Sequence, residues 1–206
     1  MSFAGFPVAA LDFYDDLELD NTKSFWEAHK HVYADSVKAP MAALTDSLAE
    51  EFGPAKMFRP YRDVRFSKDK SPYKTHQGAF VPVAPGAGWY VQLSAAGVMV
   101  GAGFYDAGSN LARFRAAVDD DVVGEQLRTL LTGLDGFEIG GERLKTTPRG
   151  YAADHPRIDL LRHKSLTVST NYGFEPFIHT AELAERVRAD WGATRGFVDW
   201  VAARLG

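Results

Sequence analysis

Residues 79–105 constrain the fold most, because they contain three stretches typical of strands, over 79–83, 89–94 and 98–105. Between residues 89 and 94, Trp, Val and Leu alternate with Tyr, Gln and Ser, which is typical of a half-buried strand. Gly97 predicts a turn into a further strand over 98–105, and hence a hairpin. Gly101 and Gly103 in that strand predict the close approach of another backbone or a ligand.

Helical periodicity flanks these strands on both sides. Helices are expected over residues 8–19, 21–33 with Asn21 as its cap, 36–52, 110–118, 122–131, 180–191 and 194–205. A short hairpin is expected between 137–139 and 143–146, and a strand over 166–171. We therefore expect an α+β fold, a single domain over residues 1–206 with a central, mostly antiparallel sheet covered by several helices.

Composition narrows the class of protein. A chain of 206 residues that is 46% apolar is long enough for one core, and it contains no linker. The absence of Cys excludes disulfides and thiolate chemistry and favours a reducing compartment. No apolar run approaches the roughly 18 residues of a membrane span. We expect a cytoplasmic protein without membrane contact, metal or cofactor, of open oligomeric state.

Residues 59–74 reverse the charge of the chain locally. The run holds six Lys and Arg residues and two carboxylates, a formal charge of +4 within a protein of −4. Pro60 and Pro72 each remove a backbone donor, and the apolar residues follow neither periodicity, so the run is predicted to be a loop. Loops rich in Arg, Tyr and Lys often carry binding sites, although internal pairing with Asp63 and Asp69 would make this one merely a solvated surface.

A second basic segment covers residues 143–164. It also holds six basic residues and two carboxylates, so the remainder of the chain carries a formal charge of −12. That acidic remainder makes nucleic acid an unlikely partner, since phosphate neutralisation requires an extended basic face.

Two motifs give these segments a likeness to a known family. Residues 61–74 read YRDVRFSKDKSPYK, and residues 148–151 read PRGY, followed by Asp154-His155-Pro156. Both resemble motifs of the bacterial and fungal domain of unknown function 2461 family. The resemblance covers nearly the whole chain. It implies a single-domain α+β protein but supplies no activity, so the chemistry must be argued from the residues.

The arginines are the strongest candidates for binding, because a guanidinium binds phosphate or carboxylate through two parallel hydrogen bonds. The leading hypothesis is an electropositive pocket, formed where the two basic segments meet, that binds a phosphorylated or carboxylated small molecule. The anion-binding candidates are Arg62, Arg65, Lys68, Lys70, Lys74 and Arg149.

Two alternatives stay open. In the first, the same pocket is an enzyme for phosphoryl or acyl transfer, in which His155, oriented by Asp154, or Asp63 moves a proton; His76 is a further acid or base candidate. The Ser-x-x-Lys spacings that begin at Ser67 and Ser71 are a weak acyl-transfer signal. In the second, the chain binds single-stranded nucleic acid or an acidic protein. The stacking or substrate-contact candidates are Tyr61, Phe66, Tyr73 and Tyr151.

Overall fold

The computed structural model describes residues 2–65, 68–105 and 108–205, and its chain divides into two compact units. The first unit comprises Met1–Val81, Tyr90–Val100 and Asn171–Ala189, and the second comprises Pro82–Trp89, Gly101–Thr170 and Asp190–Gly206.

The expected α+β class is confirmed. The described residues form a six-stranded, mostly antiparallel sheet in the order β1-β2-β3-β4-β6-β5. Its strands are β1 (Lys56–Met57), β2 (His76–Ala84), β3 (Ala87–Ser94), β4 (Gly97–Phe104), β5 (Glu138–Gly140) and β6 (Leu166–Gly173). Two-residue turns join β2 to β3 and β3 to β4, so the predicted hairpin is part of a three-stranded meander.

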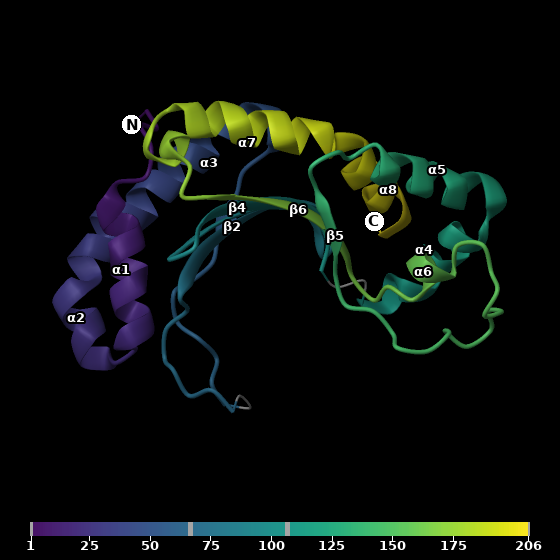
Figure 1. Ribbon diagram of the computed structural model, residues 1–206, viewed down its shortest axis with the longest axis horizontal. Helices are drawn as coiled ribbons and strands as arrows, with labels where there is room; N and C mark the ends of the chain where they lie inside the picture. Colours follow the sequence, from purple (N-terminus) through teal and green to yellow (C-terminus); the bar gives the residue numbers. More distant parts are fainter. Residues whose placement is uncertain (1, 66–67, 106–107, 206) are drawn as a thin grey trace. The chain divides into compact units, whose positions relative to one another are not determined.

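The helices of the first unit form a nearly continuous run before the sheet. They are α1 (Val8–Leu19), α2 (Lys23–Val32), the π-helical segment η1 (Tyr33–Lys38) and α3 (Ala39–Phe52), followed later by the 3₁₀ segment η3 (Pro176–His179) and by α7 (Glu182–Ala193), which crosses into the second unit. α1 and α2 lie side by side (Figure 1). The break expected near residues 33–36 is absent, because η1 carries the helix through it.

The core of the first unit is built from the apolar rows of these helices and from strand residues. Leu17, Met41, Leu44 and Leu93 are fully buried. The N-terminal segment is tied to η3, since the amide of Phe6 donates to the carbonyl of Ile178 over 2.9 Å.

The second unit has its own helices and core. Its elements are η2 (Gly108–Asn110), α4 (Leu111–Asp119), α5 (Asp121–Thr132), α6 (Ile158–Leu161) and α8 (Arg195–Leu205). The rings of Phe104 and Phe114 pack edge to face at 4.9 Å. Asp120 caps α5 by accepting hydrogen bonds from the amides of Val122 and Val123, the ordinary role of Asp at a helix N-terminus.

Two details of the sheet test predictions that were made from the sequence. A Cβ at Gly103, where φ is +127°, would lie 2.2 Å from the carbonyl oxygen of Leu166. The glycines of β4 are therefore required for the close approach of β6, one of the two predicted possibilities. The hairpin expected between 137–139 and 143–146 is wrong, because β5 pairs with β6 in the register Ile139 to Val168.

Candidate functional site

The first basic segment forms a two-armed ribbon between β1 and β2. We call residues 59–74 the basic ribbon. Tyr61 and Tyr73 pair in an antiparallel bridge, and the amides of Arg62 and Lys74 donate to the carbonyls of Pro72 and Pro60 over 2.9 and 2.8 Å. The predicted loop thus has paired arms, which extend away from β2 (Figure 1). Each proline lacks a donor but contributes its carbonyl to the pairing.

One face of the ribbon is anchored to the start of α2 by aromatic rings. The ring of Tyr73 is buried and stacks on Trp26 at 4.4 Å, with 8° between the planes. Tyr61 contacts the same Trp26 at 5.9 Å and remains 51% exposed. Tyr73, a predicted substrate contact, is therefore covered by protein, whereas Tyr61 offers part of its ring to a ligand.

Asn21 holds this face in place and is not the cap of α2. Its side chain donates to the carbonyl of Tyr73 over 3.0 Å and accepts from the amide of Tyr73 over 3.1 Å. The cap is Thr22, whose hydroxyl accepts from the amide of Phe25. The sequence prediction failed because Asn and Thr are both good caps, and only the packing of the ribbon assigns the two roles.

The opposite face of the ribbon is cationic. Arg62 and Lys74 flank the bridged tyrosines, so strand alternation turns them to the other face. Lys74 Nζ lies 5.2 Å from the centre of the Phe58 ring. The pKa of Lys74 is lowered by partial burial and by the charges of Arg59 and Arg62. The pKa of His76 is lowered by burial, by Lys74 and by Arg62, so these groups lie close enough to repel one another.

The tip of the ribbon is held by internal ion pairs. Arg62 pairs with Asp69, and Arg65 pairs with Asp63 over 2.6 Å. Lys70 donates to the carbonyl of Val64. Two predicted anion-binding arginines thus already have carboxylate partners, as the alternative of internal pairing anticipated.

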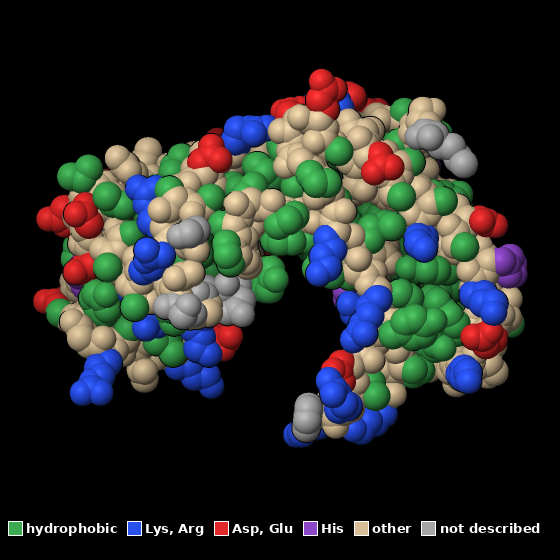
Figure 2. All heavy atoms as spheres, turned by 180° about the vertical axis from the view of Figure 1, so that it is seen from behind, with side chains coloured by type: hydrophobic (Ala, Val, Ile, Leu, Met, Phe, Trp, Pro, Cys, Tyr) green, Lys and Arg blue, Asp and Glu red, His purple; other side chains and the backbone are tan. Residues whose placement is uncertain are grey.

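Further groups at the tip bear on the catalytic predictions. The hydrogen bonds from Arg65 lower the pKa of Asp63, which weakens that carboxylate as a base. Lys68 is exposed. Ser71 begins no helix and instead binds Asp69 through its amide and hydroxyl groups. Phe66 and Ser67 lie outside the described residues. Figure 2 shows Lys and Arg side chains gathered along the basic ribbon.

The second basic segment presents Arg149 at the corner of a turn in the second unit. The amide of Tyr151 donates to the carbonyl of Pro148 over 3.3 Å, and Gly150 has a φ of +93°. Glycine at this third position of a four-residue turn supplies the positive φ of a type II turn. A Cβ at Gly150 would meet no atom within 4 Å. Glycine is therefore required here for its positive φ and not for lack of space. Arg149 itself is exposed.

His155 lies between two partners. Its Nδ1 accepts the amide of Arg157 over 3.0 Å, so Nε2 carries the proton and donates to Asp119 over 3.1 Å. The partner that fixes the tautomer is Asp119 and not Asp154, because α4 brings Asp119 across from a distant part of the sequence. Tyr151 lies beside His155 with ring centres 6.4 Å apart. Burial and the charge of Asp119 raise the pKa of Tyr151, opposed by Arg115.

Arg157 shows how the second segment uses its positive charge. Its side chain is 5% exposed and donates to the carbonyls of Val118 and Asp119 and to the carboxylate of Asp121. These carbonyls end α4, where a cation also complements the helix dipole. Lys164, from the same segment, pairs with Glu142. The charges of Arg157 and Lys164 therefore stabilise the local fold.

The predicted site residues are divided between the two units. Tyr61, Arg62, Asp63, Arg65, Lys68, Lys70, Tyr73 and Lys74 belong to the first unit, and Arg149, Tyr151 and His155 to the second. The meeting of the two basic segments in one pocket stays a prediction. Sequence reasoning missed the roles of Asn21, Asp119 and Arg157, which contact groups at least 36 positions away in the chain.

The comparisons with known proteins identify the family. The family described as "Conserved hypothetical protein (DUF2461)" matches residues 9–200. The chain belongs to this family. The match includes the ribbon and the turn at Arg149, so the resemblance drawn from those two motifs is confirmed. No curated protein and no solved structure matches the chain.

The described residues of this family member contain neither a membrane-spanning helix nor a cluster of metal-ligating side chains. None of its described helices is both long and apolar enough to cross a membrane. Within the same residues, no three His, Asp or Glu side chains gather in a way that could hold a metal ion.

Proposed function

We propose that this protein binds a small molecule carrying a phosphate or carboxylate group at the cationic face of the basic ribbon. The binding groups are Lys74, Arg62 and the imidazole of His76, with Arg59 adding to the positive potential. Guanidinium and ammonium groups are the ordinary protein partners of such anions.

The environment of Lys74 is the main observation that supports the proposal. It is half-buried, and its pKa is lowered by burial and by two arginines. Within the part of the chain that the structure describes, no carboxylate oxygen lies within 4.0 Å of Lys74 Nζ. A partly buried cation among like charges is destabilised, and a bound anion relieves that repulsion. The ligand would therefore raise the pKa values of Lys74 and His76.

The pairing of Arg62 with Asp69 does not prevent binding. The carboxylate of Asp69 is 54% exposed, and an exposed ion pair contributes only about 0 to 1 kcal/mol. A ligand that satisfies Arg62 at the half-buried base of the ribbon replaces this pair at small cost. Arg65 is 76% exposed, so we assign it a supporting role through long-range attraction, together with Lys68 and Lys70.

The geometry favours binding over the two alternatives. Both ring nitrogens of His155 are occupied within the protein, so a catalytic His155 would first have to release Asp119 or the Arg157 amide. Stacking of a polymer's bases would rely on Tyr61 among the ribbon tyrosines, since Tyr73 is covered by Trp26. Binding of phosphate or a small organic acid requires neither the release of His155 from its partners nor stacking on the ribbon tyrosines.

Titration with inorganic phosphate and with citrate at constant ionic strength tests the proposal. We expect the NMR signals of the His76 ring to shift and its pKa to rise when the anion binds. Lys74→Ala should weaken binding about tenfold or more, equivalent to about 1.4 kcal/mol. Lys38→Ala, which removes an exposed lysine from η1, should leave the affinity unchanged. Equal affinities of these two variants and of the parent protein would refute the site.

A further inference from the structure

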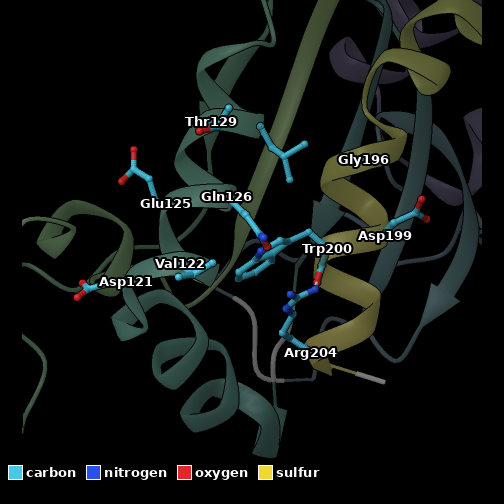
Figure 3. Close-up of a pocket in the computed structure, with 10 residues that line it drawn as sticks. Asp121, Val122, Glu125, Gln126, Thr129, Gly196, Asp199, Trp200 and Arg204 are labelled. Atoms are coloured by element: carbon cyan, nitrogen blue, oxygen red, sulfur yellow. Dashed lines mark hydrogen bonds between the residues drawn. The ribbon is translucent and has the colours of Figure 1, made fainter.

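A groove of about 810 Å³ lies between α5 and α8 of the second unit (Figure 3). Its aromatic residue, Trp200, is only 4% exposed. The carboxylate of Asp121 pairs with Arg157. That of Glu125 pairs with Arg128. These groups stabilise the second unit. The face of β2 that continues the cationic side of the basic ribbon is different, because its aromatic and polar groups are half-buried and lie next to the proposed anion site.

On this face a tyrosine ring lies against the backbone of β2. His76 and Gly78 are alternate residues of β2, so they share a face of the sheet and their Cα atoms lie about 7 Å apart. A Cβ at Gly78 would lie 2.3 Å from the hydroxyl oxygen of Tyr90 and 2.7 Å from its Cε2 atom. Only glycine therefore leaves room for the phenol end of Tyr90. The ring of Tyr90 lies on the face that also carries His76 of the proposed anion site.

Phe58 links this ring to Lys74. The centres of the Phe58 and Tyr90 rings lie 6.2 Å apart, with 41° between the planes. Lys74 Nζ lies 5.2 Å from the centre of the Phe58 ring. Both aromatic side chains are half-buried, so each leaves part of its ring surface to a ligand. We call these two rings the aromatic platform, and it begins where the cationic face of the ribbon ends.

Gln92 adds a hydrogen-bond donor beside the aromatic platform. The hydroxyl of Tyr90 donates to Oε1 of Gln92 over 2.9 Å. Burial raises the pKa of Tyr90 to about 12, so this hydroxyl keeps its proton at neutral pH. The amide oxygen of Gln92 is thus occupied, and its Nε2 group is left to donate. Among the residues that the structure describes, none accepts a hydrogen bond from this nitrogen, which stays accessible. The side chains of Gln92, Lys74 and Arg62 therefore all offer donors to a ligand.

We propose that the anion bound at the basic ribbon carries a flat aromatic ring with a hydrogen-bond acceptor, and that this ring stacks on Tyr90 and accepts from Gln92. The inference rests on the proposed function, since it extends the same site. The surrounding donors select the ring, because the hydroxyl protons of a saturated sugar would require acceptors, whereas a ring nitrogen or carbonyl accepts from Gln92. Aromatic rings also gain from offset stacking on one another. Nucleotides and aromatic carboxylic acids share this chemistry.

Isothermal titration of the full chain with two matched pairs of anions, at constant ionic strength, tests the inference. The pairs are adenosine 5′-monophosphate with ribose 5-phosphate, and pyridine-3-carboxylate with cyclohexanecarboxylate. In at least one pair the aromatic member should bind about tenfold or more tightly than its saturated partner. The pair with the larger ratio identifies a nucleotide or an aromatic acid as the ligand. Equal affinities within both pairs would overturn the inference.

Two variants connect this preference to the aromatic platform. Tyr90→Leu should remove the preference, and Gln92→Met, which deletes the donor but keeps the length of the side chain, should reduce it several-fold. Both should leave the affinity for inorganic phosphate unchanged. Phe174→Leu, at a 66% exposed aromatic residue of the same unit, is the matched control and should keep the preference. An unchanged preference in both platform variants, with melting temperatures equal to that of the parent, would place the ring elsewhere.

The anion site itself is tested separately with inorganic phosphate. Phosphate binding that Lys74→Ala weakens, without a preference for either aromatic anion, would refute this inference and support the proposed function. If neither phosphate nor any of the four organic anions bound, the proposed function would fail, and this inference with it.

Discussion

The two basic segments carry equal formal charge, but the fold uses them differently. In the second segment Arg157 is buried against the end of α4 and Lys164 pairs with Glu142. In the basic ribbon, Lys74 lies half-buried among like charges, and Arg62 has an exposed partner. Charge that is already satisfied within the protein stabilises structure, whereas charge held in mutual repulsion favours an external anion. Counting charges along a sequence therefore does not locate a site.

The largest expected effect is on stability, and it separates charge that stabilises structure from charge that binds an anion. Arg157→Ala removes three hydrogen bonds and leaves two carbonyl groups at the end of α4 without this donor. We expect a loss of about 3 kcal/mol in the free energy of unfolding, measured by urea denaturation. Arg157→Lys should recover only part, because an ammonium group lacks the guanidinium geometry. Unchanged stability, or a selective loss of phosphate binding, would contradict the structural role that we assign to Arg157.

Substitutions of two adjacent residues, Asn21 and Thr22, test whether Asn21 anchors the basic ribbon. Asn21→Ala removes both hydrogen bonds to Tyr73 and should cost about 1 to 2 kcal/mol of stability. It should also weaken phosphate binding several-fold, because the ribbon loses its attachment. Thr22→Ala is the control, since loss of the α2 cap should cost about 1 kcal/mol without affecting the ribbon. Equal phosphate affinity in the two variants would show that Asn21 does not position the site.

Acid should destabilise the protein through one histidine of each unit. Burial lowers the pKa of His163, opposed by the hydrogen bond to Ser165, and burial with Lys74 and Arg62 lowers that of His76. The unfolded chain then binds more protons below about pH 6.5, so the free energy of unfolding should fall as the pH drops through that value and the lowered pKa values. Phosphate should reduce this loss in His163→Asn, which retains His76, but not in His76→Asn. If phosphate reduced the loss of stability equally in both variants, His76 would not be part of the binding site.

The smallest expected effect concerns the turn of the second segment. If binding depends on the cationic face of the ribbon, Arg149→Ala should change the phosphate affinity less than about twofold, as expected for an exposed charge screened by salt. Isothermal titration at two ionic strengths measures this. A loss as large as that of Lys74→Ala would instead show that both basic segments bind one ligand, as predicted from the sequence.

Much of the fold could be predicted from local patterns. Helix α1 was predicted with its observed bounds, Val8–Leu19. The hairpin of β3 and β4 was predicted from alternation and Gly97, because burial of one face imposes a period on the chain. Gly101 and Gly103 predicted the close approach of a backbone or a ligand, and it is the backbone of β6 that approaches Gly103. The β5 pairing could not be predicted, since its partner β6 lies about 30 positions further along the chain, and a three-residue strand shows too few alternations to select a partner.

The sequence by itself determined the α+β class, the family and the two segments in which positive charge is concentrated. Tertiary structure decided which of those charges are available. Asp119 and not Asp154 binds His155, Asn21 binds Tyr73 in place of capping α2, and pairing of the ribbon arms turns Lys74 and Tyr73 to opposite faces. Periodicity is a property of neighbouring residues, whereas burial and ion pairing depend on groups that meet only in the folded chain.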